Sequence, residues 1–336
     1  MIQELLPVIR REYRLEPIEI KPCGPVWKIS DPSGIYGLKR TGRNPGELTW
    51  LATVINGLSE SGFSGLLPVL PAQSGHPFVT AAGKRYILSR WMEGNHPSFS
   101  DTYQRKTAVA LYGSLHRAAA AVRSFPKPEL ENWFETCRER TNFLENLRDS
   151  LERRASNRVD RAIQKQIEYY LAQARLALNG LAASGFEAWQ LETDQYGFCH
   201  NDPAPRNIIM ARQWILIDYE LSGCGVFVRE LATLSQRILK LNQWNRRIFD
   251  ELINHYSSVR SLNDRELNFL VHMMVFPQRF WRICSQRFQE RLDWSERRFA
   301  GRLWEIAAEE QARLTFLAEL LPELKELTGR CPGGME

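Results

Sequence analysis

Residues 199–210 are the most informative segment of this chain, and they read Cys-His-Asn-Asp-Pro-Ala-Pro-Arg-Asn-Ile-Ile-Met. Asp202 stands five positions before Asn207 in this stretch, and apolar residues follow the loop. A second apolar run, 214–217, ends at Asp218. We therefore expect a strand to enter the loop and a tight hairpin to follow it, which would bring Asn207 and Asp218 to one face.

The reaction that best uses this set of side chains is phosphoryl transfer. Its catalysis depends mainly on positioning the reactants and on stabilising the charge of the transferred phosphoryl group. We interpret Asp202 as the base that accepts the proton of the attacking hydroxyl. Mg²⁺ prefers hard oxygen ligands, which Asn207 and Asp218 supply. The alternative is that Asp202 and Asn207 only cap a turn.

The spacing of His200, Asp202 and Asn207, followed by Ile-Asp-Tyr-Glu at 217–220, resembles the signature of aminoglycoside phosphotransferases and choline kinases. The resemblance implies an α+β, bilobal protein-kinase-like fold with a small β-rich N-lobe and a large, mostly helical C-lobe. In these families the matching Asp is the catalytic base, the matching Asn and second Asp bind Mg²⁺, and the matching His is structural. The resemblance therefore implies catalysis by Asp202, metal binding by Asn207 and Asp218, and a supporting role for His200.

The N-terminal part supplies a second motif. Residues 36–40 read Tyr-Gly-Leu-Lys-Arg and resemble the strand whose lysine holds the ATP phosphates in kinases. We expect Lys39 to bind the α- and β-phosphates. Glu47, near the start of the next helix, is its expected ion-pair partner, because a partner fixes where a flexible lysine points. The alternatives are a solvated lysine at a strand end and a glutamate favoured by the helix dipole.

The other nucleotide-binding elements have weaker signals. Residues 21–27 stand where kinases have a glycine-rich turn, but Gly24 is the only glycine among them. The chain has no Gly-x4-Gly-Lys-Ser/Thr motif, which excludes a P-loop NTPase. The resemblance places the backbone of Arg90, Trp91 and Met92 at the end of the last N-lobe strand, facing the adenine of ATP.

Turn and cap signals predict the elements around these motifs. Asp-Pro-Ser-Gly at 31–34 is typical of a hairpin turn, and Asn44-Pro45 is typical of the start of a helix, which we expect to run to about Leu58. Apolar residues at helical spacing predict further helices over 2–15, 101–121, 130–181 and 229–327.

The change from strand-like to helical patterns predicts the domain organisation. Residues 1–92 are the expected nucleotide-binding lobe, with a five-stranded sheet and one main helix. Residues 93–94 are the expected hinge. Residues 95–336 are the expected helical lobe, which would hold the catalytic loop and the acceptor site.

The composition bounds the class of protein. Hydrophobic residues make up 43% and charged residues 25% of the chain, which is ordinary for a soluble globular protein. The net charge of +5 is mild, so we expect no nucleic acid partner. No uncharged apolar run approaches the ~18 residues of a membrane helix, so we expect no membrane span. The six scattered cysteines lack Cys-x-x-Cys spacing, which favours a reducing cytoplasm over a zinc site or disulfides.

Three further segments resemble the CotS-type spore coat family. Residues 202–207 read Asp-Pro-Ala-Pro-Arg-Asn, which resembles the catalytic loop of that family. Residues 228–232 read Val-Arg-Glu-Leu-Ala where that family has Val-Arg-Asp-Leu-Ala. Residues 276–282 read Phe-Pro-Gln-Arg-Phe-Trp-Arg, and Trp133 also fits that family. This resemblance implies spore coat proteins as alternative partners and the spore coat as an alternative location.

Glu230 departs from the pattern of the relatives, most of which carry Asp at this position. The role of that Asp is to hold the backbone of the catalytic loop, so the resemblance implies structural support by Glu230. A glutamate on a helix surface is the alternative. Because Glu is one methylene longer than Asp and the phosphate turn has a single glycine, a pseudokinase stays an alternative.

The acceptor site leaves two chemistries open. Seven arginines between residues 279 and 302 either attract an anionic acceptor or form solvated helix faces. An aromatic cage for a quaternary amine would instead use Trp281, Trp294, Trp304 or Tyr219, although such residues at helical spacing are more often core.

These residues together predict an enzyme that passes the γ-phosphoryl group of ATP, with Mg²⁺, to a hydroxyl of a small-molecule acceptor. One alternative is a spore coat or scaffold protein that has the kinase fold but weak or no catalytic activity. A choline kinase-like enzyme is the second. The absence of Asp-Phe-Gly and Ala-Pro-Glu at the required places disfavours a protein-Ser/Thr kinase.

Overall fold

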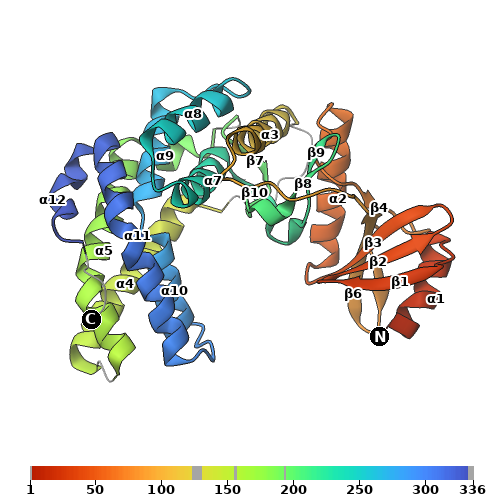
Figure 1. Ribbon diagram of the computed structural model, residues 1–336, viewed down its shortest axis with the longest axis horizontal. Helices are drawn as coiled ribbons and strands as arrows, with labels where there is room; N and C mark the ends of the chain where they lie inside the picture. Colours follow the sequence, from red (N-terminus) through yellow and green to blue (C-terminus); the bar gives the residue numbers. More distant parts are fainter. Residues whose placement is uncertain (1, 123–130, 155–156, 193, 332–336) are drawn as a thin grey trace. The chain divides into compact units, whose positions relative to one another are not determined.

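The computed structural model describes residues 2–122, 131–154, 157–192 and 194–331. The chain folds into two compact units. The first unit comprises residues 1–129 and 196–225, and the second, here called the helical unit, comprises 130–195 and 226–336. The first unit holds the main β-sheet and the second is mostly helical, which confirms the predicted α+β class (Figure 1).

The first unit is built on a six-stranded antiparallel sheet. Its order is β1-β2-β3-β6-β4, and β5 also pairs with β6. The strands are β1 (Glu19–Cys23), β2 (Val26–Asp31), β3 (Gly34–Thr41), β4 (Val69–Leu70), β5 (Val79–Ala81) and β6 (Lys84–Arg90). The number of strands exceeds the expected five by one, because the short strands β4 and β5 both pair with the long strand β6.

The hairpin predicted at 31–34 is confirmed, with Asp31 opposite Gly34 where β2 turns into β3. Asp31 Oδ1 accepts a hydrogen bond from Ser33 N at 2.8 Å, which closes an Asx-type turn. Gly34 has a φ of 142°, a conformation that glycine adopts more readily than other residues. This turn sets the register of β3, the strand that carries Lys39.

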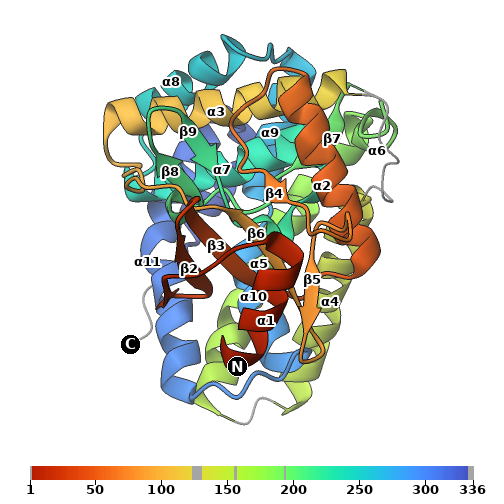
Figure 2. The same cartoon turned by 90° about the vertical axis from the view of Figure 1, so that its right-hand side faces the viewer.

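Helix α1 (Ile2–Tyr13) packs on this sheet (Figure 2). Leu5 and Ile9, one turn apart, are buried in one cluster with Leu38 of β3 and Leu88 of β6. Full burial of such a side chain contributes about 1.5–3 kcal/mol, so the cluster fixes β3 firmly. Successive side chains of a strand point to opposite faces, so the Lys39 side chain leaves the sheet on the face opposite to Leu38.

Helix α2 (Pro45–Glu60) begins where Asn44-Pro45 predicted it. Asn44 Oδ1 accepts from Glu47 N at 2.9 Å, and Asn44 N donates to Glu47 Oε2 at 2.8 Å. The two bonds form a complete capping box, which satisfies donors that the first turn of a helix leaves open.

The rest of the first unit surrounds the Asp202 loop. Helix α3 (Thr102–Ala121) confirms the helix expected over 101–121, and it is capped by the Asp101 side chain. Strand β7 (Tyr196–Cys199) pairs with β10 (Gly223–Val226), and β8 (Ile208–Met210) pairs antiparallel with β9 (Trp214–Leu216). The predicted strand into the loop and the predicted hairpin after it are therefore both confirmed.

The helical unit contains most of the remaining helices. They are α4 (Trp133–Arg154), α5 (Arg158–Ala183), α6 (Phe186–Trp189), α7 (Phe227–Leu241), α8 (Arg246–Ser257), α9 (Asp264–Val275), α10 (Gln278–Phe288), α11 (Glu296–Leu320) and α12 (Lys325–Thr328). The stretch expected as one helical region over 130–181 contains two helices, because Asn157 caps the start of α5.

Helices α4, α5, α10 and α11 pack side by side around one apolar core (Figure 1). Tyr170 of α5 stacks on Phe280 of α10 with ring centroids 4.1 Å apart. Leu144 of α4 and Leu303 of α11 are fully buried in the same core. This packing holds α4 against α10, so that Arg140 of α4 lies over the ring of Trp281 of α10. None of the helices in the described part of the chain is long and apolar enough to span a membrane.

Candidate active site

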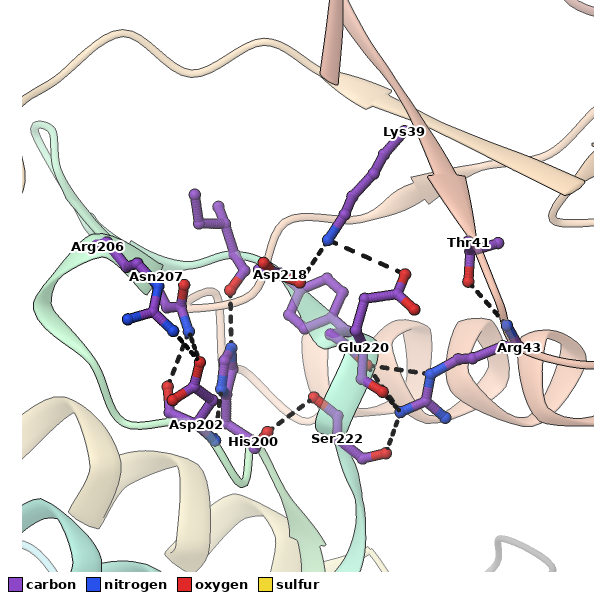
Figure 3. A network of polar contacts seen from close by, with 12 residues as sticks. Lys39, Thr41, Arg43, His200, Asp202, Arg206, Asn207, Asp218, Glu220 and Ser222 are labelled. Atoms are coloured by element: carbon purple, nitrogen blue, oxygen red, sulfur yellow. Dashed lines mark hydrogen bonds and ion pairs between the residues drawn. The ribbon is translucent and has the colours of Figure 1, made fainter. Parts of the chain in front are cut away.

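The Asp202 loop is held by its own side chains. Asn207 is almost fully buried, and its Nδ2 donates to Asp202 O at 2.9 Å and to Asp202 Oδ2 at 2.7 Å (Figure 3). Asn201 has a φ of 62°, a left-handed conformation that Asn tolerates better than most residues. The two bonds from one amide fix both the backbone and the carboxylate of Asp202.

Arg206 is a second donor to the Asp202 carboxylate. Its Nη2 lies 2.7 Å from Asp202 Oδ2, although its side chain is 68% exposed and that of Asp202 only 14%. The sequence interpretation assigned no role to Arg206. Its position four residues after Asp202 was the only indication in the sequence of this contact. That spacing alone does not distinguish a partner of Asp202 from a solvated arginine.

The hairpin of β8 and β9 joins the segment before Asp218 to this loop. Ile208 pairs with Leu216 across the hairpin, and Ile217 N donates to Asn207 O at 2.9 Å. Asp218 therefore follows directly on a residue that is hydrogen-bonded to Asn207.

Asp218 also meets the predicted phosphate-binding lysine. Lys39 Nζ donates a hydrogen bond to Asp218 Oδ1, and it lies 3.9 Å from Glu220 Oε1 (Figure 3). Burial by itself would raise the pKa of Asp218, but the hydrogen bond and positive charge of Lys39 keep that pKa below its usual value. Asp218 has a φ of 68°, uncommon for a residue other than glycine. The site thus holds a strained aspartate against a fixed ammonium.

Glu47, the expected ion-pair partner of Lys39, forms its hydrogen bonds with Asn44. It closes the capping box of α2 with Asn44, and it lies in the first turn of that helix, where the helix dipole favours a glutamate. Lys39 forms its ion pairs with Asp218 and Glu220 instead. Glu220 stood in the quoted motif without a role, and its approach to Lys39 depends on the turn after Asp218.

Arg43 is a further residue that the sequence interpretation missed. It follows β3, and its Nη2 donates to the backbone oxygens of Tyr219 at 2.8 Å, of Glu220 at 3.0 Å and of Ser222 (Figure 3). Arg43 Nε also donates to Tyr219 O at 3.1 Å. One guanidinium therefore ties the 3-10 turn η2 (Tyr219–Leu221) to the segment after β3. Every residue has a backbone carbonyl oxygen, so no sequence motif could predict this contact.

His200 has surroundings suited to the structural role expected for it. Its side chain is fully buried, and its Nε2 donates to Ile217 O at 2.8 Å. Ser222 Oγ donates to His200 O at 3.2 Å. Tyr219 is also buried, and its hydroxyl donates to Leu216 O at 2.7 Å. These contacts join the loop before Asp202 to the segment around Asp218.

The remaining predicted residues lie on separate elements. Gly24 occupies the turn between β1 and β2 with a φ of 60°. Arg90 ends β6, Trp91 N donates to Ile35 O at 2.9 Å, and Met92 follows. Glu230 lies in the first turn of α7 in the helical unit, with its side chain buried. The roles expected for these residues stay predictions.

The donor set around Asp218 suits a hard divalent cation. Asp218 and Glu220 offer carboxylate oxygens, and Asn207 offers its amide oxygen because its Nδ2 is bound to Asp202. Oxygen ligands of this kind fit Mg²⁺ rather than zinc or copper. A carboxylate acceptor, a hard-cation donor set and a phosphate-binding ammonium are the parts that phosphoryl transfer requires.

Comparison with known protein families also indicates a phosphotransferase. A model of the family described as "Phosphotransferase enzyme family" matches residues 54–262, which include the Asp202 loop and Asp218. The curated relative "Spore coat protein S" of Bacillus subtilis (strain 168) is 22% identical over 312 residues, 89% of this chain and 87% of the relative.

Solved structures share the fold over nearly the whole chain. An aminoglycoside phosphotransferase from Alicyclobacillus acidocaldarius has a TM-score of 0.81 with 20% identity, over 95% of both chains. A spectinomycin phosphotransferase solved in complex with ADP and spectinomycin has a TM-score of 0.61 with 14% identity, over 97% of both chains. The expected resemblance to aminoglycoside phosphotransferases, choline kinases and a spore coat protein is confirmed.

Proposed function

Because the chain belongs to the phosphotransferase enzyme family, we propose that it transfers the γ-phosphoryl group of ATP, with Mg²⁺, to a hydroxyl of a small-molecule acceptor. The observation that carries this proposal is the contact between Lys39 and Asp218, one residue from the backbone bond that joins Ile217 to Asn207. This contact supports the proposal because it joins the lysine proposed to bind phosphate to an aspartate proposed to bind Mg²⁺, close in sequence to the Asp202 loop.

Each side chain has a task in this reaction. Asp202 accepts the proton of the acceptor hydroxyl, with its carboxylate aimed by Asn207 and Arg206. Lys39 binds phosphate oxygens, and Asn207 and Asp218 hold Mg²⁺, which neutralises charge on the phosphates. The backbone at Gly24 and at residues 90–92 lies against the nucleotide. The ADP bound to the spectinomycin phosphotransferase of the same fold supports an adenine nucleotide as cosubstrate.

The test is an ADP-release screen on the purified protein with ATP and Mg²⁺, over sugars, amino alcohols, nucleosides and aminoglycosides. We expect one class of acceptor to give turnover, and Asp202→Ala to lower kcat by about 10²–10⁴-fold because the base is lost. The control is nucleotide binding by Asp202→Ala, measured as a rise in melting temperature with ATP and Mg²⁺. Turnover that survives in Asp202→Ala would refute the assignment of the base.

A spore coat or scaffold protein without turnover is the second candidate. It is favoured by the relative named spore coat protein S and by the single glycine in the turn between β1 and β2. If neither ATP nor ATP with Mg²⁺ changes the melting temperature, the scaffold function is supported and the kinase function fails. Spore coat proteins would then be the partners to seek by co-purification from spores. For an active kinase, the expected location is the cytoplasm.

A choline kinase-like activity makes a separate prediction, because it requires choline-dependent ADP release. The burial of Tyr219, whose hydroxyl is bonded to backbone, removes one of the four aromatic residues considered for a quaternary amine cage. Choline therefore belongs in the amino alcohol arm of the same screen, with ethanolamine beside it.

A further inference from the structure

The helical unit contains a group of arginines arranged around two tryptophan rings. Arg140 of α4 has its Cζ 4.1 Å from the ring centroid of Trp281 on α10 and 4.8 Å from that of Trp133 at the start of α4. Arg229 of α7 has its Cζ 4.1 Å from the centroid of Trp133. Arg282, the residue after Trp281 on α10, is close enough for its charge to act on Arg140. We call these five residues the arginine–tryptophan cluster.

The cluster carries more positive than negative charge. Arg229 Nη1 pairs with Glu131 Oε2 at 2.8 Å, whereas Arg140 Nη1 donates to the uncharged amide oxygen of Gln278 at 2.7 Å. Burial lowers the pKa of Arg140, and the charges of Arg229 and Arg282 lower it further, whereas Cys137 and Glu131 raise it. The charges that act on Arg140 are thus those of two guanidinium groups, Arg229 and Arg282, and of one carboxylate, Glu131.

The thiol of Cys137 carries no counter-charge near neutral pH. Cys137 lies one turn before Arg140 on α4, and burial raises the pKa of its thiol to about 12, so the thiol stays neutral. Of the acids near Arg140 on the same helix, Glu135 pairs with the exposed Arg138 at 2.6 Å, and Glu139 is exposed.

This arrangement is costly unless an anion joins it. Gathering like charges in a partly buried place costs free energy, which a bound anion with several oxygens offsets. Indole faces fix the plane of a guanidinium, so that its donors are already oriented for a planar or tetrahedral acid group. Charge-assisted bonds from arginine to carboxylate or phosphate are among the strongest that proteins form.

We propose that the arginine–tryptophan cluster is a binding site for a small ligand with a phosphate or carboxylate group. The guanidinium groups of Arg140 and Arg282 bind the acid group, and Trp133 and Trp281 hold the guanidinium of Arg140 in place. This site explains three of the residues that the sequence pattern singled out, Trp133, Trp281 and Arg282. The proposed phosphotransferase function is not needed for it.

A second consequence rests on the proposed kinase function. If the ligand of the cluster is the acceptor, the acceptor is an acidic alcohol, such as a sugar phosphate or a sugar acid. Binding is measured without turnover, so a kinase function that fails leaves the binding result intact, and the reverse also holds.

Titration of the unmodified protein with glucose 6-phosphate, gluconate and glucose, followed by indole fluorescence and calorimetry, tests the site. We expect saturable binding of at least one acidic probe and none of glucose, with the two acidic probes distinguishing phosphate from carboxylate. Arg282→Gln, at an exposed position, is expected to weaken binding about tenfold or more. Arg140→Gln is expected to do the same, with circular dichroism to check folding.

The matched control is Arg138→Gln, which removes an exposed arginine of the same helix outside the cluster. It should leave the affinity unchanged. The proposal is overturned if the unmodified protein binds neither acidic probe, if glucose binds equally well, or if Arg138→Gln weakens binding as much as Arg282→Gln does.

Discussion

The ammonium of Lys39 donates to the carboxylate of Asp218, although 179 positions separate the two residues in the chain. A lysine from the sheet and an aspartate from the segment after β9 thus form one charged pair within the first unit. Since Asp218 is also an expected Mg²⁺ ligand, the pair links the phosphate-binding and metal-binding parts of the proposed reaction.

Replacing Lys39 tests this link directly. We expect Lys39→Met to lower kcat/KM for ATP about 100-fold or more, because an oriented charge at the transferred phosphoryl group is lost. The measurement is ADP release at varied ATP concentration. Arg40→Gln is the matched control, since Arg40 is the next residue of β3 and is exposed. An equal loss in both variants would show that the strand, and not the ammonium, is responsible.

Arg43 should act as a positioning residue for the segment after Asp218. Arg43→Lys keeps the charge but cannot reproduce the fan of bonds to the oxygens of Tyr219, Glu220 and Ser222. We expect a loss of about 1–3 kcal/mol in the free energy of unfolding and a clear fall in kcat. Urea unfolding and the Mg²⁺ dependence of turnover measure the two effects.

Arg212→Lys provides the comparison, since Arg212 is exposed in the hairpin between β8 and β9. It should change neither quantity. A normal Mg²⁺ dependence in Arg43→Lys would mean that Arg43 stabilises the fold without positioning Asp218.

Arg206 should affect the step that uses the base. In Arg206→Gln the Asp202 carboxylate keeps Asn207 as a donor but loses the guanidinium. We expect kcat to fall about 10- to 100-fold, because the aim of the base is relaxed, while KM for ATP changes little. Arg206→Lys should restore part of kcat. A raised KM for ATP with normal kcat would instead indicate that Arg206 binds the nucleotide.

A buried ion pair in the helical unit makes a prediction about stability. Arg313 Nε and Nη2 each lie 3.0 Å from a carboxylate oxygen of Glu310, and both side chains are buried. Glu310→Ala leaves the guanidinium uncompensated, so we expect a loss of about 3–5 kcal/mol in the free energy of unfolding. Guanidinium-induced unfolding followed by circular dichroism checks this.

The same helix offers an exposed pair as the control. Arg302 and Glu305 of α11 pair at 2.9 Å with both side chains about half exposed. Glu305→Ala should cost no more than about 1 kcal/mol, since exposed pairs contribute little. Equal losses in the two variants would contradict the dominant role of burial.

The predictable part of the site was the part contained within a short segment. Asp202, Asn207 and the hairpin to Asp218 lie within 17 residues, and the apolar runs and the turn between them are enough to place them together. Lys39 could be recognised from its strand, but its partner could not. Glu47 follows Lys39 closely in sequence, but its side chain forms the capping box of α2 with Asn44.

The places where local elements begin and turn could be predicted from neighbouring residues alone. The Asx-type turn at Asp31, the cap at Asn44 and the loop from His200 to Asn207 each depend on neighbouring residues, whose chemistry is readable without the fold. Three contacts arise only when the chain is folded: Lys39 bonds to Asp218, Arg43 holds the turn after Asp218, and Arg140 lies between two tryptophans. These partners come from distant segments, and charged side chains pair with whichever opposite group the packing of the core brings within reach.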